Sequence, residues 1–455
     1  MGAMRVIRPA AAAAVALLVL VACGCKKKAP PDLVIVSPHN KKIEAEFEAA
    51  FRAWHKQQFG ADVKIEWRDI GGTTDVTRFL LEQYKRAPSS GIDLYFGGGG
   101  PDHKFLTARG ITAPVKLPAE IMRQLPETIT GVRQYDPDGH WHAAAVSCFG
   151  IIYNAKLMRE KGMKFPESWD DLASPSMYGL IAAADGTQSG SARAAYEMII
   201  QSEPNWQAGW AKLLKIFANC RRFTAGASDI PEAVANGDIL AGAAIDFYAY
   251  DQIAFSGDAV AFVRVAGTTA FTPDPISLLK GAPHPTAAKR FIEFVLSQRG
   301  QALWCLPARA EDGPASSPLF RQPIRRDVYD KYAGKMLAPL VNPFVYSGDF
   351  KYDEAAAGVR ISRLLGPLMK AAAIDQRAEM SKAWKCIIDA DFPADLIDPF
   401  VALPENLAEE ATALETAKTL TTKTAEDRRR TEMTTSAWQR YFRTKYNGIV
   451  NRAAK

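Results

Sequence analysis

The chain has 455 residues, of which 48% are hydrophobic and 10% aromatic, enough for one large core and for two or three domains. Its 56 Lys and Arg outnumber its 50 Asp and Glu by only six, and basic runs at 26–28 and 428–430 account for much of the excess, so we expect no nucleic-acid binding. After residue 30, charges or prolines interrupt every apolar stretch before it reaches the ~20 residues of a membrane span. We therefore expect a soluble globular body.

The first 25 residues have the three-part organisation of an export signal. Arg5 and Arg8 precede an uncharged run that ends in Leu20-Val21-Ala22-Cys23, which resembles the lipobox of bacterial lipoproteins. We predict a signal peptide over 1–22, a lipid on Cys23 and a charged, stiff tether over 23–31. This places the protein in the periplasm or cell envelope, held to the membrane by its lipid alone. An ordinary signal peptide or an uncleaved anchor is the alternative.

Strand-like and helix-like segments alternate from residue 33 onward. The first part of the pattern is strand, helix, strand, helix, strand, which predicts a mostly parallel α/β sheet. Its segments are 33–36, 43–59, 63–67, 75–84 and 92–96. A second α/β pattern follows, with strands or helices at 141–153, 180–184, 192–201, 239–248, 261–265 and 286–303. From Pro307 onward, the composition predicts helices at 355–373, 377–388 and 407–446.

Several segments resemble, in the same order, the extracellular solute-binding proteins of the iron(III)-type branch, also called family 1. They are Gly150–Asn154, Pro166–Pro175, Ile230–Asp238, Asp274–Pro285, Ala288–Ile292 and Gly300-Gln301. Each segment alone is a weak signal, but their order and spacing make the set specific.

The resemblance implies an α/β fold of the periplasmic-binding-protein-like type II class, in which two lobes joined by a hinge close on a ligand. We place lobe 1 at 32–140 and 255–309 and lobe 2 at 141–254. The composition after Pro307 adds a helical C-terminal extension at 310–455, which lies outside the core of this family. The implied function is that of a monomeric substrate-binding component, which binds a small anionic or oxygen-rich solute and delivers it to an ABC permease. A lipid-anchored sensor or scaffold is a different class that stays open.

Three polar loops are candidates for the ligand site. In the first, Ser37-Pro38-His39-Asn40, we single out Ser37 and His39, although the segment also fits a simple N-cap turn. In the second, Gly72 lets the backbone approach a ligand while Thr73 and Thr74 offer hydroxyls, and a plain capping turn is the alternative.

The third loop, 185–191, is the best candidate for an anion cradle, because hydroxyls and amides precede a predicted helix whose N-terminus is positive. Thr187, Ser189 and Gly190 are its predicted ligand-binding residues, with helix capping as the alternative. Ser147 is a further candidate. The four glycines at 97–100 could also bring bare backbone amides to the cleft, but we favour their interpretation as a tight connection.

Transport of Fe(III) is the alternative for the solute. Iron-binding members of the family carry adjacent tyrosines together with a histidine and a carboxylate. Here Ala249 stands between Tyr248 and Tyr250, so only a variant iron site is conceivable, made of these two tyrosines, His39 and Asp246. We therefore predict that Asp246 and Tyr248 contact an anion and that no resident cofactor or metal is needed.

No nucleophile or metal motif supports an enzyme, since the chain lacks GxSxG, HExxH, a paired-cysteine metal site and a nucleotide fingerprint. We expect no catalysis. Four cysteines of the body, Cys148, Cys220, Cys305 and Cys386, allow three full disulfide pairings in an oxidising compartment, or are small buried hydrophobic residues.

Overall fold

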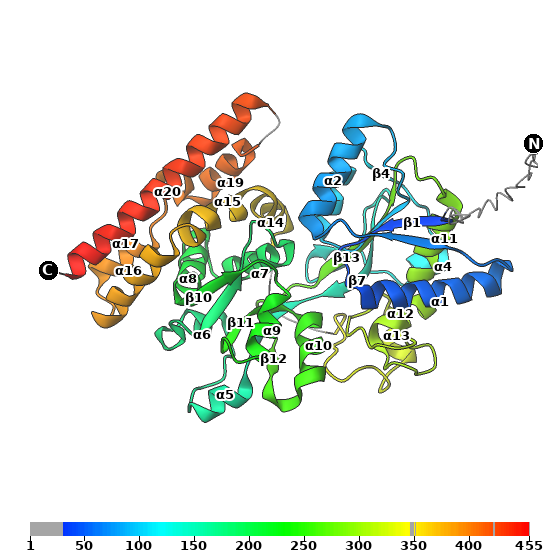
Figure 1. The fold of residues 1–455 in the computed structure, drawn as a ribbon, viewed down its shortest axis with the longest axis horizontal. Coiled ribbons are helices and arrows are strands. Elements are labelled where there is room, and N and C mark those ends of the chain that lie inside the picture. Colours follow the sequence, from blue (N-terminus) through cyan, green and yellow to red (C-terminus); the bar gives the residue numbers. More distant parts are fainter. Residues whose placement is uncertain (1–30, 346–349, 351, 422–423, 455) are drawn as a thin grey trace, which may run out of the picture.

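The structure is a computed structural model that describes residues 31–345, 350, 352–421 and 424–454. The predicted signal peptide, Cys23 and all but the last residue of the tether lie outside the described residues. Two α/β lobes lie side by side, and the C-terminal helices, orange to red in Figure 1, pack on the second lobe.

The first lobe is built on a six-stranded sheet in the order β2-β1-β3-β13-β4, with β7 also paired to β13. The strands β1, β2 and β3 are parallel, whereas β13 is antiparallel to β3, β4 and β7. The strands are β1 (Leu33–Val36), β2 (Ile65–Arg68), β3 (Leu94–Phe96), β4 (Thr112–Ala113), β7 (His142–Ser147) and β13 (Thr272–Leu279). Apolar clusters cover this sheet, which is why β1 and β3 consist of buried residues without alternation.

The helices of the first lobe are α1 (Lys41–Phe59), α2 (Thr73–Arg86), α3 (Gly100–Thr107), α4 (Ala119–Met122), α11 (Pro285–Val295), α12 (Gln298–Cys305) and α13 (Arg326–Lys331). A small hairpin adds β5 (Thr128–Ile129) and β6 (Val132–Arg133). The single helix predicted over 286–303 is two helices, because the chain leaves helical geometry at Leu296 and Ser297 caps α12 by accepting from the N–H of Gly300 at 3.0 Å.

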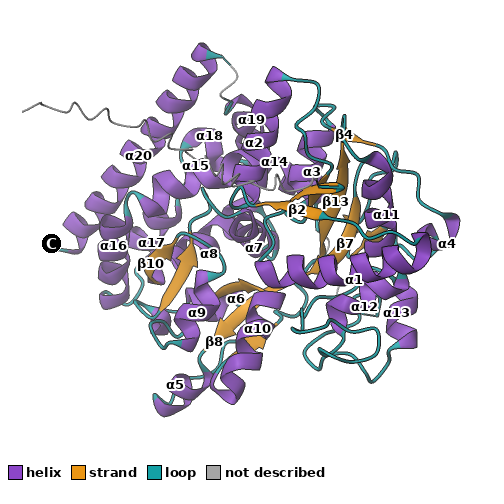
Figure 2. Ribbon diagram, turned by 45° about the vertical axis from the view of Figure 1, so that its right-hand side comes forward, coloured by secondary structure: helices purple, strands orange, loops and turns teal. Residues whose placement is uncertain are grey.

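The second lobe contains a five-stranded sheet in the order β10-β9-β11-β8-β12. Its strands are β8 (Phe149–Tyr153), β9 (Ile181–Ala184), β10 (Cys220–Thr224), β11 (Ala241–Ile245) and β12 (Ala261–Val263). Its helices are α5 (Ala155–Glu160), α6 (Trp169–Ala173), α7 (Gly190–Gln201), α8 (Trp206–Asn219), α9 (Asp229–Ala235) and α10 (Asp246–Ser256), with short 3-10 turns at Pro175–Met177 and Gly257–Ala259. Figure 2 shows helices packed around the strands of both lobes.

Strand pairing moves both predicted lobe boundaries. The long segment 141–153 is not one strand of lobe 2: its first half, β7, pairs with β13 in the first sheet, and its second half, β8, pairs with β11 in the second. The chain crosses between lobes at Cys148. Likewise β12 belongs to the second sheet, so the return crossing lies between β12 and β13 rather than at residue 255. A period-two pattern cannot show such a change of sheet, because both halves are equally apolar.

The predicted extension 310–455 is not one unit. Its first part packs on the first lobe, where Val328 and Tyr332 share a small core with α12 and the carboxylate of Glu46 accepts from three backbone N–H groups at 315–317. The part from residue 352 packs on the second lobe. Its elements are α14 (Glu354–Val359), π-helical turns at Arg360–Leu364 and Lys370–Ile374, α15 (Leu365–Met369), α16 (Arg377–Asp389), α17 (Ala394–Val401), α18 (Glu405–Ala408), α19 (Glu410–Thr419) and α20 (Ala425–Ala453). We call residues 352–454 the C-terminal wall.

The C-terminal wall shares one hydrophobic core with the second lobe. Trp384 donates to Asn219 Oδ1 at 2.7 Å, and Trp206 donates to the carbonyl of Leu407 at 2.7 Å. The fully buried carboxylate of Glu197 pairs with Arg360, whose side chain is also buried. The C-terminal wall is therefore packed into the core of the second lobe. Figures 1 and 2 both place α16, α17 and α20 together at the outer end of this lobe.

Within the described ranges, the helices offer no segment with the length and hydrophobicity of a membrane span. Cys148, Cys220, Cys305 and Cys386 are free thiols, and the first three are buried, which agrees with the reading of small hydrophobic residues.

Candidate functional site

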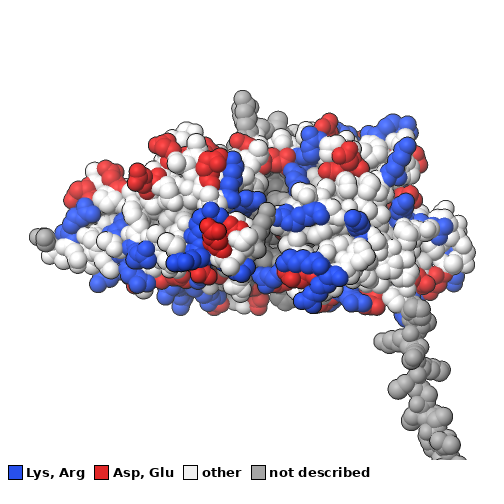
Figure 3. Space-filling model, turned by 90° about the horizontal axis from the view of Figure 1, so that it is seen from above, with Lys and Arg blue, Asp and Glu red and all other residues white. Residues whose placement is uncertain are grey.

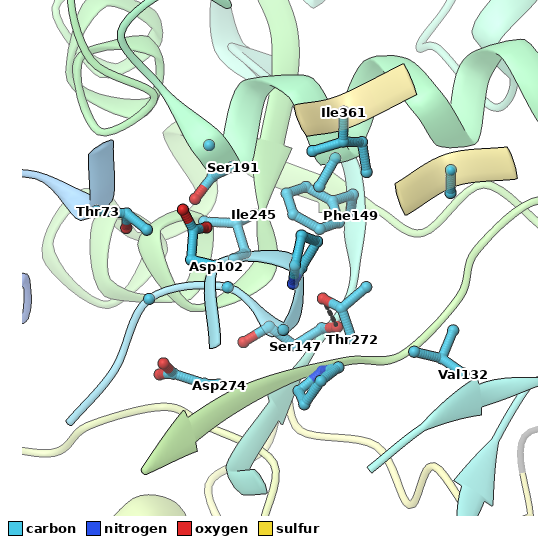
Figure 4. Close-up of a pocket in the computed structure, with 18 of the residues that line it drawn as sticks. Thr73, Asp102, Val132, Ser147, Phe149, Ser191, Ile245, Thr272, Asp274 and Ile361 are labelled. Carbon is cyan, nitrogen blue, oxygen red and sulfur yellow. Dashed lines mark hydrogen bonds between the residues drawn. The ribbon is translucent and has the colours of Figure 1, made fainter. Parts of the chain in front are cut away.

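A cavity of about 160 Å³ lies between the two lobes. Residues from the first lobe, the second lobe and the C-terminal wall line it. Figure 4 shows how Thr73, Asp102 and Asp274 from the first lobe face Ser191, Ile245 and Phe149 from the second, with Ile361 of the C-terminal wall above them.

Four helices begin at this cavity. The first residues of α2, α3 and α7 line it, as do the residues on either side of the start of α10; they are Thr73, Gly100, Gly190, Ile245 and Phe247. The first backbone N–H groups of a helix have no partner within the helix, and the helix dipole makes this end positive. The cavity therefore carries partial positive charge that no side chain supplies.

The glycine segment before α3 brings bare backbone to the cavity. Gly97 and Gly98 have φ of 98° and 93°, in the left-handed region that favours glycine. A Cβ at Gly97 would lie 2.6 Å from the ring of His39, and one at Gly98 would lie 2.4 Å from the Tyr95 hydroxyl. The segment is a tight connection, as predicted, but Gly98 to Gly100 also line the cavity.

Arg321 is the buried cation of the site. Its guanidinium pairs with Asp274 and lies 3.7 Å above the ring of Phe247. Burial lowers the pKa of Arg321 to about 10, so the group remains charged at neutral pH. Asp274 also lies 2.8 Å from Nε2 of His39.

His39 is neutral in this arrangement. Burial, with a contribution from the nearby charge of Arg321, lowers the pKa of His39 well below its ordinary value. Because Nε2 faces a carboxylate, it carries the proton, and Nδ1 is left as an acceptor. Among the described residues, Nδ1 of His39 has no hydrogen-bond partner; the same holds for Ser147 Oγ and Arg321 Nε. Such buried atoms normally have a partner, so three lining residues offer hydrogen bonds to a bound molecule or to water.

A second charged group lies on the other side of the cavity. Asp102 accepts from Thr77 Oγ1 at 3.1 Å, and burial raises the pKa of Asp102 to about 6, an effect that the charge of Arg193 opposes. Lys104 pairs with Glu354 of the C-terminal wall. The cavity thus contains carboxylates as well as cations.

Five of the predicted ligand-binding residues line this cavity, namely His39, Thr73, Ser147, Gly190 and Tyr248. Thr74 and Thr187 line instead a more open hollow of about 410 Å³ that adjoins it and includes Arg193, Arg363 and Lys370.

The other four predicted residues have structural roles. Ser37 Oγ accepts from the N–H of His39 at 3.1 Å, and Gly72 is the N-cap of α2. Ser189 accepts from the N–H of Ala192 at 3.2 Å and so caps α7. Asp246 is fully buried and accepts from the N–H of Cys148 at 3.1 Å, at the crossing between the lobes.

The four residues of the variant iron site do not all line the cavity. Only His39 and Tyr248 line the cavity. The hydroxyl of Tyr250 accepts from Arg264, and burial raises the pKa of Tyr250, which opposes formation of a phenolate ligand. Among the described residues, no group of three or more His, Cys, Asp and Glu side chains is placed to hold a metal ion.

Arg321, Asp274, Asp102 and Glu354 are site residues that the sequence interpretation missed. Asp274 could have been found, because a charged residue between two prolines is unusual in an otherwise buried strand. Asp102 follows the four glycines, for which we favoured a tight connection over a contribution to the cleft. Arg321 and Glu354 carry no local signal: they reach the cavity through long-range packing.

Several polar contacts join the lobes across the cleft. Lys42 of α1 lies 2.5 Å from Asp251 of α10, and Thr74 Oγ1 donates to the carbonyl of Gln188 at 3.5 Å. Another is the pair of Lys104 and Glu354. The two lobes therefore contact each other across the cleft and line the same cavity.

A family model described as bacterial extracellular solute-binding protein matches residues 89–328, more than half of the chain. The chain belongs to this family. The resemblance to extracellular solute-binding proteins that the sequence predicted is thereby confirmed. The match ends at residue 328, before the C-terminal wall of this solute-binding protein begins at residue 352.

Solved structures agree on the fold. The periplasmic binding protein AfuA from Actinobacillus pleuropneumoniae, solved with fructose-6-phosphate, superposes with a TM-score of 0.58 at 16% identity, covering 79% of this chain and 99% of that one. Iron-bound HitA from Pseudomonas aeruginosa has a TM-score of 0.50 at 19% identity, covering 70% and 92%. These likenesses confirm the predicted fold class of two α/β lobes, and at such identities they show the fold alone.

A curated relative is the phosphoglycerate transport regulatory protein PgtC of Salmonella typhimurium, which is 29% identical over 161 residues. The match covers 35% of this solute-binding protein and 40% of PgtC, less than half of that relative's length.

Proposed function

We propose that this protein is the monomeric substrate-binding component of an ABC importer and that its solute is a small phosphorylated compound that also carries hydroxyl groups. The lobes close on the solute and the closed complex delivers it to the permease. Closure follows from differential affinity, since a ligand that contacts both lobes stabilises only the closed state.

The observation that carries the proposal is the convergence of four helix N-termini on one cavity with the buried Arg321. Backbone N–H groups at helix N-termini suit a phosphate, and a guanidinium adds a charge-assisted hydrogen bond. Each such bond contributes about 1.5–3 kcal/mol, so a few of them reach the roughly −8 kcal/mol of micromolar binding even after association costs.

The carboxylates of the cavity indicate that the solute also carries hydroxyl groups. Asp274 balances Arg321, and Glu354 balances Lys104, so the cavity does not offer a free excess of positive side chains. Carboxylates accept hydrogen bonds from hydroxyl groups. A compound with a phosphate at one end and hydroxyls at the other offers hydrogen bonds to both the cationic groups and the carboxylates, whereas a bare anion offers none to the carboxylates.

Two relatives support this class of solute by their names, since AfuA was solved with fructose-6-phosphate and PgtC is named as a phosphoglycerate transport regulatory protein. The surface at the outer hollow supports it too. Arg193, Arg363 and Lys370 line that hollow, and such side chains attract anionic solutes toward the cleft. Figure 3 shows Lys and Arg side chains, with Asp and Glu side chains among them, on both sides of the junction between the lobes.

The decisive experiment is native mass spectrometry of protein purified without refolding, followed by calorimetric titration with fructose 6-phosphate, phosphoglycerate, inorganic phosphate and ferric citrate. Retention or micromolar binding of an organic phosphate is the expected result. A stoichiometric iron adduct with a tyrosinate absorption band, lost in Tyr248→Phe, would overturn the proposal and restore iron transport.

A further inference from the structure

The C-terminal wall takes part in the cavity itself. The lining residues from this segment are Tyr352, which precedes α14, Glu354, Ala357 and Gly358 in α14, and Ile361 in the π-helical turn that follows. All of them lie beyond the segment 89–328 that matches the family. The wall therefore supplies part of the cavity lining from outside the matched segment.

Resting on the function proposed above, we infer that Glu354 of the C-terminal wall is a specificity-determining residue, which accepts a hydroxyl group of the solute and so selects hydroxylated organic phosphates over inorganic phosphate. Glu354 is the only carboxylate that the described part of the wall places in the lining of the cavity.

The backbone around Glu354 is held by the second lobe. Asp353 caps α14, with its side chain accepting from the N–H groups of Ala355 and Ala356 at 3.0 Å each. The backbone N–H of Asp353 donates to Gln201 Oε1 at 2.7 Å, and Gln201 Nε2 donates to the carbonyl of Asp353 at 3.1 Å; Gln201 is the last residue of α7. The position of Glu354 is thus set by α7, the helix whose N-terminus also forms the cavity.

The side chain of Glu354 reaches the first lobe. One carboxylate oxygen pairs with Lys104 of α3, and the other accepts from the N–H of Arg133 in β6 at 3.3 Å. The side chain is 29% exposed and that of Lys104 is 36% exposed. An ion pair this accessible contributes little to stability. Each carboxylate oxygen has more than one lone pair, so Glu354 can still accept a hydrogen bond from a ligand while Lys104 and the Arg133 amide orient it.

Two kinds of probe, organic phosphates and inorganic phosphate, separate this role from others. Glu354→Gln removes the charge that strengthens a hydroxyl contact, so the Kd for the organic phosphate bound best by the wild type, among fructose 6-phosphate, glycerol 3-phosphate and phosphoglycerate, should rise about tenfold. The same substitution frees Lys104, so the Kd for inorganic phosphate should stay the same or fall. Calorimetric titration measures both, and Glu354→Ala should enlarge the first effect.

Two control variants accompany these measurements. Glu432→Gln removes one exposed carboxylate from α20 of the same wall and should change neither Kd. Asp251→Asn breaks the other ion pair between the lobes, with Lys42, and should weaken both probes to the same degree, because it acts on closure alone. Thermal unfolding of each variant must match that of the wild type, and Glu354→Gln retains the shape needed for folding.

Each outcome of these titrations either supports or overturns the role inferred for Glu354. Opposite or divergent changes for the two probes in Glu354→Gln support the inference. Equal weakening of both would show that Glu354 is merely a latch between the lobes, and unchanged binding of both would show that it has no role; either result overturns the inference and leaves the proposed function intact. A wild-type protein that binds none of the three organic phosphates would overturn the proposed function, and the inference with it.

Discussion

The guanidinium of Arg321 forms a buried ion pair with the carboxylate of Asp274, and both side chains are less than one-tenth exposed. Asp274 lies on β13 of the first lobe, while the guanidinium also stacks on Phe247 of the second. The pair therefore lies where the lobes meet and lines the cavity.

Arg321→Met should weaken binding of an organic phosphate about 100-fold, because a charge-assisted bond and its positive field are lost. It should also lower the free energy of unfolding by about 3 kcal/mol, since Asp274 is left as a buried charge without its main partner. Urea unfolding and calorimetric titration measure the two effects. The double variant Arg321→Met/Asp274→Asn should regain stability but not affinity, and full recovery of binding would contradict a ligand-binding role for Arg321.

Asp102 should make phosphate binding depend on pH. Burial raises its pKa in the folded protein to about 6, so the carboxyl is protonated below pH 6 and negatively charged above it. A charged Asp102 repels a phosphate, so affinity falls as the pH rises through 6. The ratio of the wild-type Kd to that of Asp102→Asn should rise about tenfold between pH 5 and 7.

The comparison with Asp102→Asn is essential, because the second ionisation of a phosphate also has a pKa of about 6. The ligand titrates equally in both proteins, and the ratio of the Kd values isolates Asp102. A ratio that stays constant across this range would show that Asp102 does not face the phosphate. Arg193, which opposes the raised pKa, should shift the midpoint upward when replaced by Gln.

Arg360 should hold the C-terminal wall to the second lobe. Arg360→Met leaves Glu197 as a fully buried carboxylate without its ion-pair partner, which should lower the free energy of unfolding by about 3–5 kcal/mol. The control is Lys385→Met, which breaks an exposed pair with Asp389 on α16 and should cost no more than about 0.5 kcal/mol. Chemical denaturation measures both, and the second lobe and the wall should unfold in one transition. Separate transitions would mean that the wall is an independent domain.

Ligand binding should compact the molecule. Small-angle scattering of the mature protein should show a smaller radius of gyration in the presence of a bound organic phosphate than in its absence, because the lobes are joined by narrow crossings at Cys148 and between β12 and β13. Asp251→Asn should shift the unliganded protein further toward the open form. An unchanged profile on demonstrated binding would exclude the hinge model.

Cys23 lies outside the described residues, and its lipid is a proposal from the sequence. Cys23→Ala should yield an unprocessed precursor or protein released from the membrane fraction, since one cysteine supplies the whole attachment. Intact-mass analysis of the membrane-bound wild type should show a mature chain that begins at Cys23 and carries acyl mass. A mature form that begins elsewhere without acyl mass would refute the anchor.

Local patterns in the sequence predicted most of the elements. The apolar run at 33–36 and the helical periodicity at 377–388 correspond closely to β1 and α16. The strand predicted over 239–248 ends at Ile245, where α10 begins, because Asp246 turns its carboxylate back to the N–H groups of Phe247 and Cys148. The second of those bonds joins residues 98 positions apart, so no local pattern could reveal it.

The sequence by itself determined the family, the two α/β lobes and five residues that line the cavity, among them His39 and Tyr248, because loops at the ends of buried strands have a polar composition that is visible locally. Only the tertiary structure decided which charges meet there. Arg321 and Asp274 are 47 positions apart, and Lys104 and Glu354 are 250 apart. Electrostatic contacts of this kind depend on distances in space that the packing of the lobes and the C-terminal wall sets, and the spacing of residues along the chain does not encode them.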